Sequence, residues 1–137
     1  MMKTFLAAVV STLLLATAAQ AAEPVKIALI DPLSGPMASA GQPAYEHLKF
    51  AAERINANGG MNGHPVEIVG LDNKLSPQES LVQLQKAMDN GGDFITQGNG
   101  SSVASALIAG IEKHNRRNPG DERLFLNYAA VDPVFTN

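Results

Sequence analysis

Short apolar segments alternate with segments of helical periodicity along most of this chain, and that alternation restricts the fold more than any other feature. Four apolar runs are predicted to be strands, at 25–31, 66–71, 94–97 and 123–128. The first, Val25–Asp31, is too continuously apolar for a sheet with one wet face, which indicates a strand covered on both sides. Repeated strand–helix–strand units predict an α/β protein built on a three-layer, open parallel sheet with right-handed crossovers.

The segments between these runs carry start and stop signals for helices. Pro43 suits the first turn of the first helix, and Asn58–Gly60 predicts its end. Ser76–Glu79 combines a capping box with a proline at the first helical position. A third helix is predicted after Gly100, and its small residues, Gly110 among them, permit close packing.

Residues 1–21 have the pattern of a secretory signal peptide. Lys3 supplies a positive start, Phe5–Ala16 is an apolar run too short to span a membrane, and Ala19–Ala21 fits a cleavage site. We therefore expect an exported domain at residues 22–137, with no stable membrane insertion after cleavage. The absence of cysteine excludes disulfides, and a net charge of −3 gives no reason to expect nucleic acid as a partner.

The stretch Phe94–Val103 is the candidate ligand-binding segment. It ends a strand, turns through Gly98 and Gly100, which allow the backbone to approach a ligand closely, and opens a helix at Ser101 and Ser102. Unpaired amides at a helix N-terminus favour an anion, and either serine hydroxyl could cap the helix or bind a carboxylate. An ordinary capped turn is the alternative that these residues leave open. The four loops after the strands are expected at one sheet edge, where ligands bind in such folds.

The sequence has no motif for catalysis or for a metal or cofactor. Its histidines have no context that ties them to a nucleophile, and it contains no G-x-S-x-G elbow. Gly98 and Gly100 lack the third glycine of a dinucleotide-binding motif, because Val103 occupies that place. Asp31 and Asp72, at strand ends, are expected to cap the following turns, with a functional role as the alternative. We expect a binding protein, with no catalytic residue, metal or cofactor.

Five pieces of the chain form a recognisable series in order and spacing: Pro32–Pro36, Ile55–Gly63, Asp72 with Pro77, Gly100–Ser102 and Ala129–Ala130. This series resembles the leucine-binding family of type I periplasmic binding proteins, the solute receptors of branched-chain amino acid ABC transporters. The resemblance covers the chain after residue 21. It implies a periplasmic receptor whose two α/β lobes close on a small solute and then dock on an inner-membrane permease. The chain stops before the family's second lobe, so we expect the incomplete first lobe and half a cleft.

The resemblance also implies which residues contact the solute. In relatives, the position of Ser101 or Ser102 binds the ligand's carboxylate, and the turn at 129–131 offers a backbone carbonyl and a threonine hydroxyl to its ammonium group. Val131 stands where that hydroxyl would be, so the resemblance implies a retained carboxylate half and an altered amine half. An amino acid and a related organic acid both remain open as ligands. The candidate ligand-binding residues are Ser34, Ser101, Ser102, Ala129, Ala130 and Val131.

Two functions fit this reading of the sequence. The first is a solute receptor of an ABC importer, which the cleavable signal peptide favours. The alternative is a ligand-sensing regulatory domain on the same scaffold, which would report the ligand to a signalling protein without transport.

Overall fold

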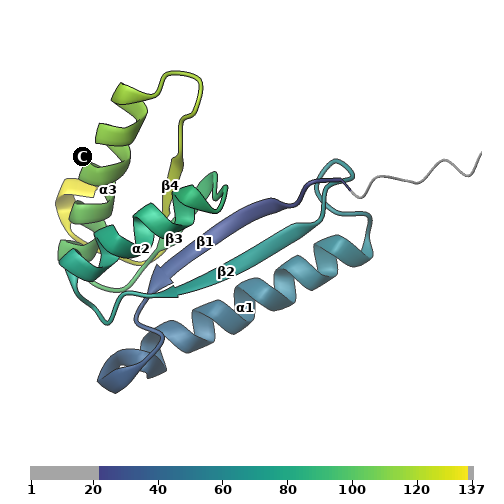
Figure 1. The fold of residues 1–137 in the computed structure, drawn as a ribbon. Helices are drawn as coiled ribbons and strands as arrows, with labels where there is room; N and C mark the ends of the chain where they lie inside the picture. Colours follow the sequence, from purple (N-terminus) through teal and green to yellow (C-terminus); the bar gives the residue numbers. More distant parts are fainter. Residues whose placement is uncertain (1–21, 136–137) are drawn as a thin grey trace, which may run out of the picture.

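A four-stranded parallel sheet forms the centre of the structure, a computed structural model that describes residues 22–135 (Figure 1). The strands are β1 (Val25–Asp31), β2 (Val66–Asp72), β3 (Phe94–Gln97) and β4 (Leu124–Asn127). Their order across the sheet is β2-β1-β3-β4. Each strand lies within one residue of its predicted bounds. The predicted signal peptide, residues 1–21, falls outside the described residues.

Helices cover both faces of this sheet and complete the three predicted layers. They are α1 (Ala38–Ala57), α2 (Pro77–Asp89) and α3 (Ser101–Arg117), with 3-10 turns η1 (Gly35–Met37) and η2 (Pro133–Phe135). α1 lies on one face, against β2, whereas α2 and α3 pack together on the other face (Figure 1). Right-handed crossovers cause this division, because the chain moves one way from β1 to β2 and the opposite way from β2 to β3. The predicted fold class is confirmed.

The main core lies between the sheet and the layer formed by α2 and α3. Its buried residues come from β1, β3 and these two helices: Ala28, Ile30, Leu84, Ala87, Ile95, Val103, Leu107 and Ile111. Gly110 allows the helices to approach closely, since a Cβ atom at this position would lie 2.8 Å from Cδ2 of Leu84. The face of α3 that carries Gly110 therefore packs against α2, in addition to the contacts of α3 with the sheet.

The helix boundaries confirm two of the predicted signals and correct a third. The Ser76 hydroxyl caps α2 by accepting a hydrogen bond from the amide of Glu79 at 3.2 Å. After the end of α1, the amide of Gly60 (φ 78°) donates to the carbonyl of Ile55 at 3.0 Å. The prediction that the first helix begins at Pro43 is wrong, because α1 begins at Ala38 and contains Pro43.

Position explains why α1 tolerates this proline. Pro43 has no amide hydrogen, so the carbonyl of Ser39, one turn earlier, loses its usual partner. Ser39 is exposed to solvent, and water can therefore take that place. The 3-10 turn at Gly35–Met37 leads directly into the helix and supplies its first turn without a start signal in the sequence.

We predict that Gly41, near the start of α1, is required for packing against the first loop. A Cβ atom at this position would lie 2.2 Å from the backbone oxygen of Pro32, so the backbone itself would have to move. We expect Gly41→Ala to lower the free energy of unfolding by about 1–3 kcal/mol, measured by urea denaturation. The control, Ser39→Ala on the exposed side of α1, should change it by less than about 0.5 kcal/mol. Equal stability of the two variants would contradict this account.

Candidate functional site

The buried carboxylate of Asp31 joins three strand ends. Asp31 is the last residue of β1 and is 0% exposed. It accepts hydrogen bonds from the backbone amides of Gly98 at 3.4 Å and Asn99 at 3.1 Å, and from the side-chain amide of Asn99 at 3.1 Å. The hydroxyl of Tyr128, which follows β4, also donates to it. One side chain therefore holds the loops after β3 and β4 against the end of β1.

Tyr128 is fitted closely to this carboxylate. Burial of its hydroxyl raises the pKa of Tyr128 well above the ordinary value of 10.0, and the hydrogen bond to Asp31 and the negative charge of Asp31 raise it further. A Cβ atom at Gly98 would lie 2.3 Å from the Tyr128 ring. The missing side chain of Gly98 thus makes room for the ring of Tyr128.

The first turn of α3 presents hydrogen-bond donors at the same sheet edge. The N-cap residue of α3 is Gly100 (φ 92°), and no side chain caps the helix. The prediction that Ser101 or Ser102 caps this helix is therefore wrong, since both serines lie inside its first turn. Because glycine adopts a positive φ readily, Gly100 can serve as the N-cap residue, and the helix begins at Ser101.

The serine hydroxyls and the amides around them remain available. Within residues 22–135, neither Ser101 nor Ser102 has a hydrogen-bond partner for its hydroxyl. The first backbone hydrogen bond of α3 runs from the amide of Ala104 to the carbonyl of Gly100 at 3.0 Å, so the amides before Ala104 precede the helical ladder. These groups, together with the positive end of the helix dipole, suit a carboxylate.

Gln97 fixes the turn that leads into α3. It is the last residue of β3 and is fully buried. Its side-chain Nε2 donates to the carbonyls of Asn99 at 2.5 Å and Gly100 at 3.4 Å, while its Oε1 is buried without a partner among the described residues. The Gln97 side chain thereby holds the carbonyls of this turn, and the amides of the first turn of α3 keep no hydrogen-bond partner among the described residues.

A second carboxylate joins the ends of β1 and β2. Asp72 accepts hydrogen bonds from the amides of Leu33 at 2.9 Å and Lys74 at 3.0 Å, and from the hydroxyl of Ser34. Partial burial raises the pKa of Asp72, but the hydrogen bonds from Ser34 and from the backbone amides outweigh it, so the pKa falls below the ordinary 3.8. The expected cap of the turn after β2 is confirmed. The matching expectation for Asp31 is wrong, because its carboxylate bonds the loops after β3 and β4 and not the turn after β1. Ser34, a candidate ligand residue, is engaged by the carboxylate of Asp72.

Asn127 fixes the loop after β4. Its Oδ1 accepts hydrogen bonds from the amides of Ala129 at 3.2 Å and Ala130 at 2.8 Å, and its Nδ2 donates to the carbonyl of Ala130 at 2.8 Å. Ala130 is buried, whereas Val131 is 85% exposed. Because β3 and β4 are neighbours, this loop and the serines of α3 lie at the same edge. Ser34 follows β1, on the other side of β3.

Sequence reasoning did not assign a role to the four residues that organise this edge: Gln97, Asn99, Asn127 and Tyr128. Asn127 stands at the end of β4, where asparagine commonly bonds the nearby backbone, and that signal could have been read. The bond from Tyr128 to Asp31 connects opposite parts of the chain, and no local pattern predicts it.

Two further properties of residues 22–135 bear on function. No three His, Cys, Asp or Glu side chains among them are grouped closely enough to hold a metal ion. None of the helices in this part of the chain has the length and apolar character needed to cross a membrane.

The chain is thus an open parallel α/β domain of the class that binds ligands at the carboxyl edge of its sheet. A family model described as periplasmic binding protein matches residues 24–134, and the chain belongs to that family. The resemblance inferred from the motifs is confirmed. The family is one of binding proteins, so the chain is not an enzyme.

Individual relatives support this assignment. The chain is 38% identical over 132 residues to Leu/Ile/Val-binding protein homolog 4 of Brucella abortus (strain 2308), a match that covers 94% of this chain and 32% of that protein. It is 30% identical over 74 residues to the Leu/Ile/Val-binding protein of Escherichia coli (strain K12), covering 54% of this chain and 20% of that protein. The chain therefore spans about a third or less of the length of these curated relatives.

A solved structure gives the same result. The closed conformation of the leucine-, isoleucine-, valine-, threonine-, and alanine-binding protein from Brucella ovis superposes with a TM-score of 0.75 at 38% identity. The match covers 80% of this chain and 28% of that one.

The contact between Tyr128 and Asp31 predicts unusual resistance of Tyr128 to ionisation. Because the carboxylate disfavours the phenolate, the ultraviolet absorbance of tyrosinate in a Tyr45→Phe variant should appear only well above pH 10. The native contact therefore adds stability that is present below pH 10 and is lost as the pH rises through the raised pKa. Adding Asp31→Asn should move the titration to lower pH. An unchanged titration curve would show that Asp31 does not control Tyr128.

The hydrogen bonds of Asp72 predict that the difference in stability between the native chain and an Asp72→Asn variant depends on pH. Since the folded-state pKa lies below the unfolded value of 3.8, the native contacts add stability above that pH, and this is lost as the pH falls through the lower, folded-state pKa. We expect Asp72→Asn to be less stable than the native chain at neutral pH and to approach it in acid, as measured by thermal unfolding across pH. Glu53→Gln, exposed on α1, is the control. A stability gap that stayed constant down to pH 2 would refute this prediction.

Proposed function

We propose that this chain forms the first lobe of a periplasmic solute receptor of an ABC importer. In this proposal, residues 1–21 direct export and are removed, and a second lobe closes over a small solute bound at the carboxyl edge of the sheet. The solute carries a carboxylate and is an amino acid or a related organic acid. The receptor then docks on an inner-membrane permease.

The observation that carries the proposal is the free first turn of α3. Two serine hydroxyls without partners and the amides before Ala104 lie at the edge where ligands bind in open parallel sheets. The neighbouring turn at 129–131 is held rigid by Asn127. Relatives named for binding leucine, isoleucine and valine, all of which carry a carboxylate, support the same ligand class.

Magnitudes indicate how much of the affinity one lobe supplies. A helix N-terminus stabilises an anion by about 0.3–2 kcal/mol, whereas micromolar binding requires about 8 kcal/mol. The remainder must come from burial of the ligand's apolar body, at roughly 25 cal/mol per Å², and from contacts made by a second lobe. The chain alone should therefore bind its solute no tighter than about millimolar.

Weak binding of this kind is best tested by two-dimensional NMR on the full chain. The probes are leucine, 4-methylpentanoate, which lacks the amine, and 3-methylbutylamine, which lacks the carboxylate. We expect leucine and 4-methylpentanoate, which both carry a carboxylate, to shift the backbone amide signals of Ser101–Val103. We expect 3-methylbutylamine to leave these signals unchanged. Stronger binding of leucine than of 4-methylpentanoate would identify an amino acid site. Equal binding would favour an organic acid.

Serine variants test the residues themselves. We expect Ser101→Ala or Ser102→Ala to weaken binding of 4-methylpentanoate by roughly tenfold or more, because a hydrogen bond to a charged group contributes about 1.5–3 kcal/mol. Ser105→Ala, an exposed serine one turn further along α3, is the matched control and should bind as the native chain does. Native affinity in both Ser101→Ala and Ser102→Ala would remove the serines from the site.

A further inference from the structure

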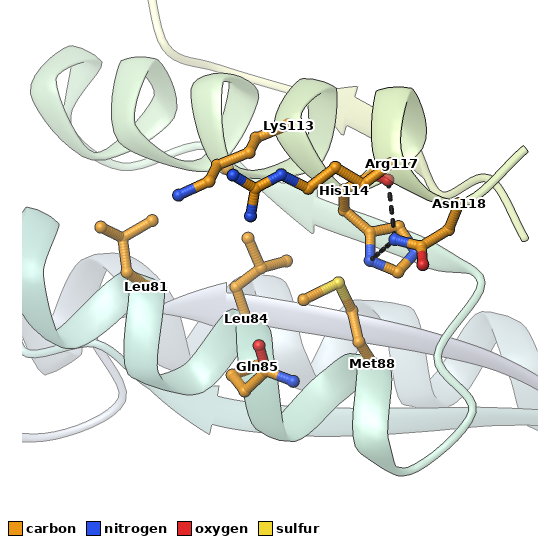
Figure 2. Close-up of a pocket in the computed structure, with 9 residues that line it drawn as sticks. Leu81, Leu84, Gln85, Met88, Lys113, His114, Arg117 and Asn118 are labelled. Atoms are coloured by element: carbon orange, nitrogen blue, oxygen red, sulfur yellow. Dashed lines mark hydrogen bonds between the residues drawn. The ribbon is translucent and has the colours of Figure 1, made fainter.

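A groove of about 320 Å³ lies between the C-terminal halves of α2 and α3 (Figure 2). Leu81, Leu84 and Met88 of α2 form an apolar side of this groove. Lys113 and Arg117 extend from α3 toward them in Figure 2, with their charged ends above the apolar side chains. The groove thus combines an apolar floor with a cationic rim.

The two cations on this rim are not neutralised by the protein. Within residues 22–135, neither Lys113 nor Arg117 has a side-chain hydrogen bond or an ion pair, and no residue that lines the groove is acidic. Neighbouring basic groups are engaged: Arg116 pairs with Glu112 at 3.4 Å, and His114 contacts the carbonyl of Asp121 at 2.8 Å. The groove therefore presents two positive charges without partners over an apolar floor, in a chain whose net charge is −3.

We propose that this groove binds an acidic, amphipathic helical segment of a partner protein. From Leu81 to Met88, α2 covers about 10 Å, or two helical turns, which is the span of apolar residues at i, i+3 and i+7 on a docked helix. Leu81 is 38% exposed and offers apolar surface for such a residue. Carboxylates that flank the docked apolar residues would pair with Lys113 and Arg117.

Charge argues against the other occupants of this groove. A second copy that placed its own groove against this one across a two-fold axis would bring the four cations of the two rims together, and like charges would repel. An anionic membrane surface is usually bound by clusters of about four to eight basic residues, and this rim has two free cations in an acidic chain. A short acidic protein segment matches both the small number of charges and the apolar floor.

The proposal is independent of the solute site. The groove is lined by the C-terminal half of α3, whereas the candidate solute site uses its N-terminal turn. Loss of solute binding in Ser101→Ala or Ser102→Ala would leave the groove unaltered. Failure of one proposal is thus distinguishable from failure of the other.

The test uses fluorescence anisotropy with the full chain and a labelled helical peptide of about 14 residues. The peptide carries leucines at i, i+3 and i+7 flanked by glutamates, and a comparison peptide has lysines in place of the glutamates. We expect the glutamate peptide to bind at least roughly tenfold tighter than the lysine peptide, with affinity that falls as salt is added. Lys113→Glu combined with Arg117→Glu should reverse this preference. Leu81→Asn should weaken binding of both peptides.

Matched controls separate the groove from general charge effects. Arg116→Glu reverses one charge on α3 outside the groove and should keep the native preference, whereas Lys113→Glu or Arg117→Glu alone, with the same change of charge, should weaken it. Circular dichroism of each variant verifies that it is folded. Equal affinity for the two peptides, or a preference unchanged by the double charge reversal, would overturn the proposal. Self-association of the chain, or binding to phosphatidylglycerol vesicles, that is abolished by the same reversal would also overturn it in favour of that occupant.

Discussion

The carboxylate of Asp31 is the interaction on which the ligand edge of the sheet depends. A buried carboxylate is costly unless donors replace the water that it has lost, and here the donors come from the loops after β3 and β4. Neither loop can move away without leaving a buried charge unsatisfied. The positions of the serines of α3 and of the turn after β4 consequently depend on the end of β1, a core strand, in addition to the local hydrogen bonds of Gln97 and Asn127.

Most of the fold could be predicted because its elements carry local signals. The apolar run of β1, the Ser76 cap of α2 and the glycines after α1 each act within a few residues, so the sequence pattern is sufficient to place them. The start of α1 could not be placed in this way. The 3-10 turn at Gly35–Met37 leads into the helix without a start signal in the sequence, whereas Pro43, inside the helix, supplied a misleading one.

The sequence predicted at which edge of the sheet the candidate residues lie, but not the hydrogen bonds that hold them there. Strand–helix alternation is enough to bring the loops to one edge, and the serines of α3 lie there. Which loops bond to one another depends on the strand order β2-β1-β3-β4, which no local motif contains. Asp31 therefore pairs with the loops after β3 and β4, whereas Asp72 pairs with Ser34 after β1. Of the two strand-end carboxylates, Asp72 caps the turn that follows it, as expected. Asp31 instead bonds the loops after β3 and β4, a contact that only the strand order of the sheet could define.

α3 connects the two surfaces for which functions are proposed, and both of them favour a negatively charged partner. Unpaired amides at its N-terminus favour an anionic ligand, while basic residues in its last turns stabilise the helix whether or not a partner binds. That stabilisation explains why positively charged residues occur at positions 113 and 117, but not why the side chains of Lys113 and Arg117 point toward α2. Arg116 and His114 serve the same helix end while engaged with neighbouring residues, whereas Lys113 and Arg117 lie over Leu81 and Leu84 with no partner in the described part of the chain. Their placement supports a role for these two charges beyond stabilising the helix, in binding a partner.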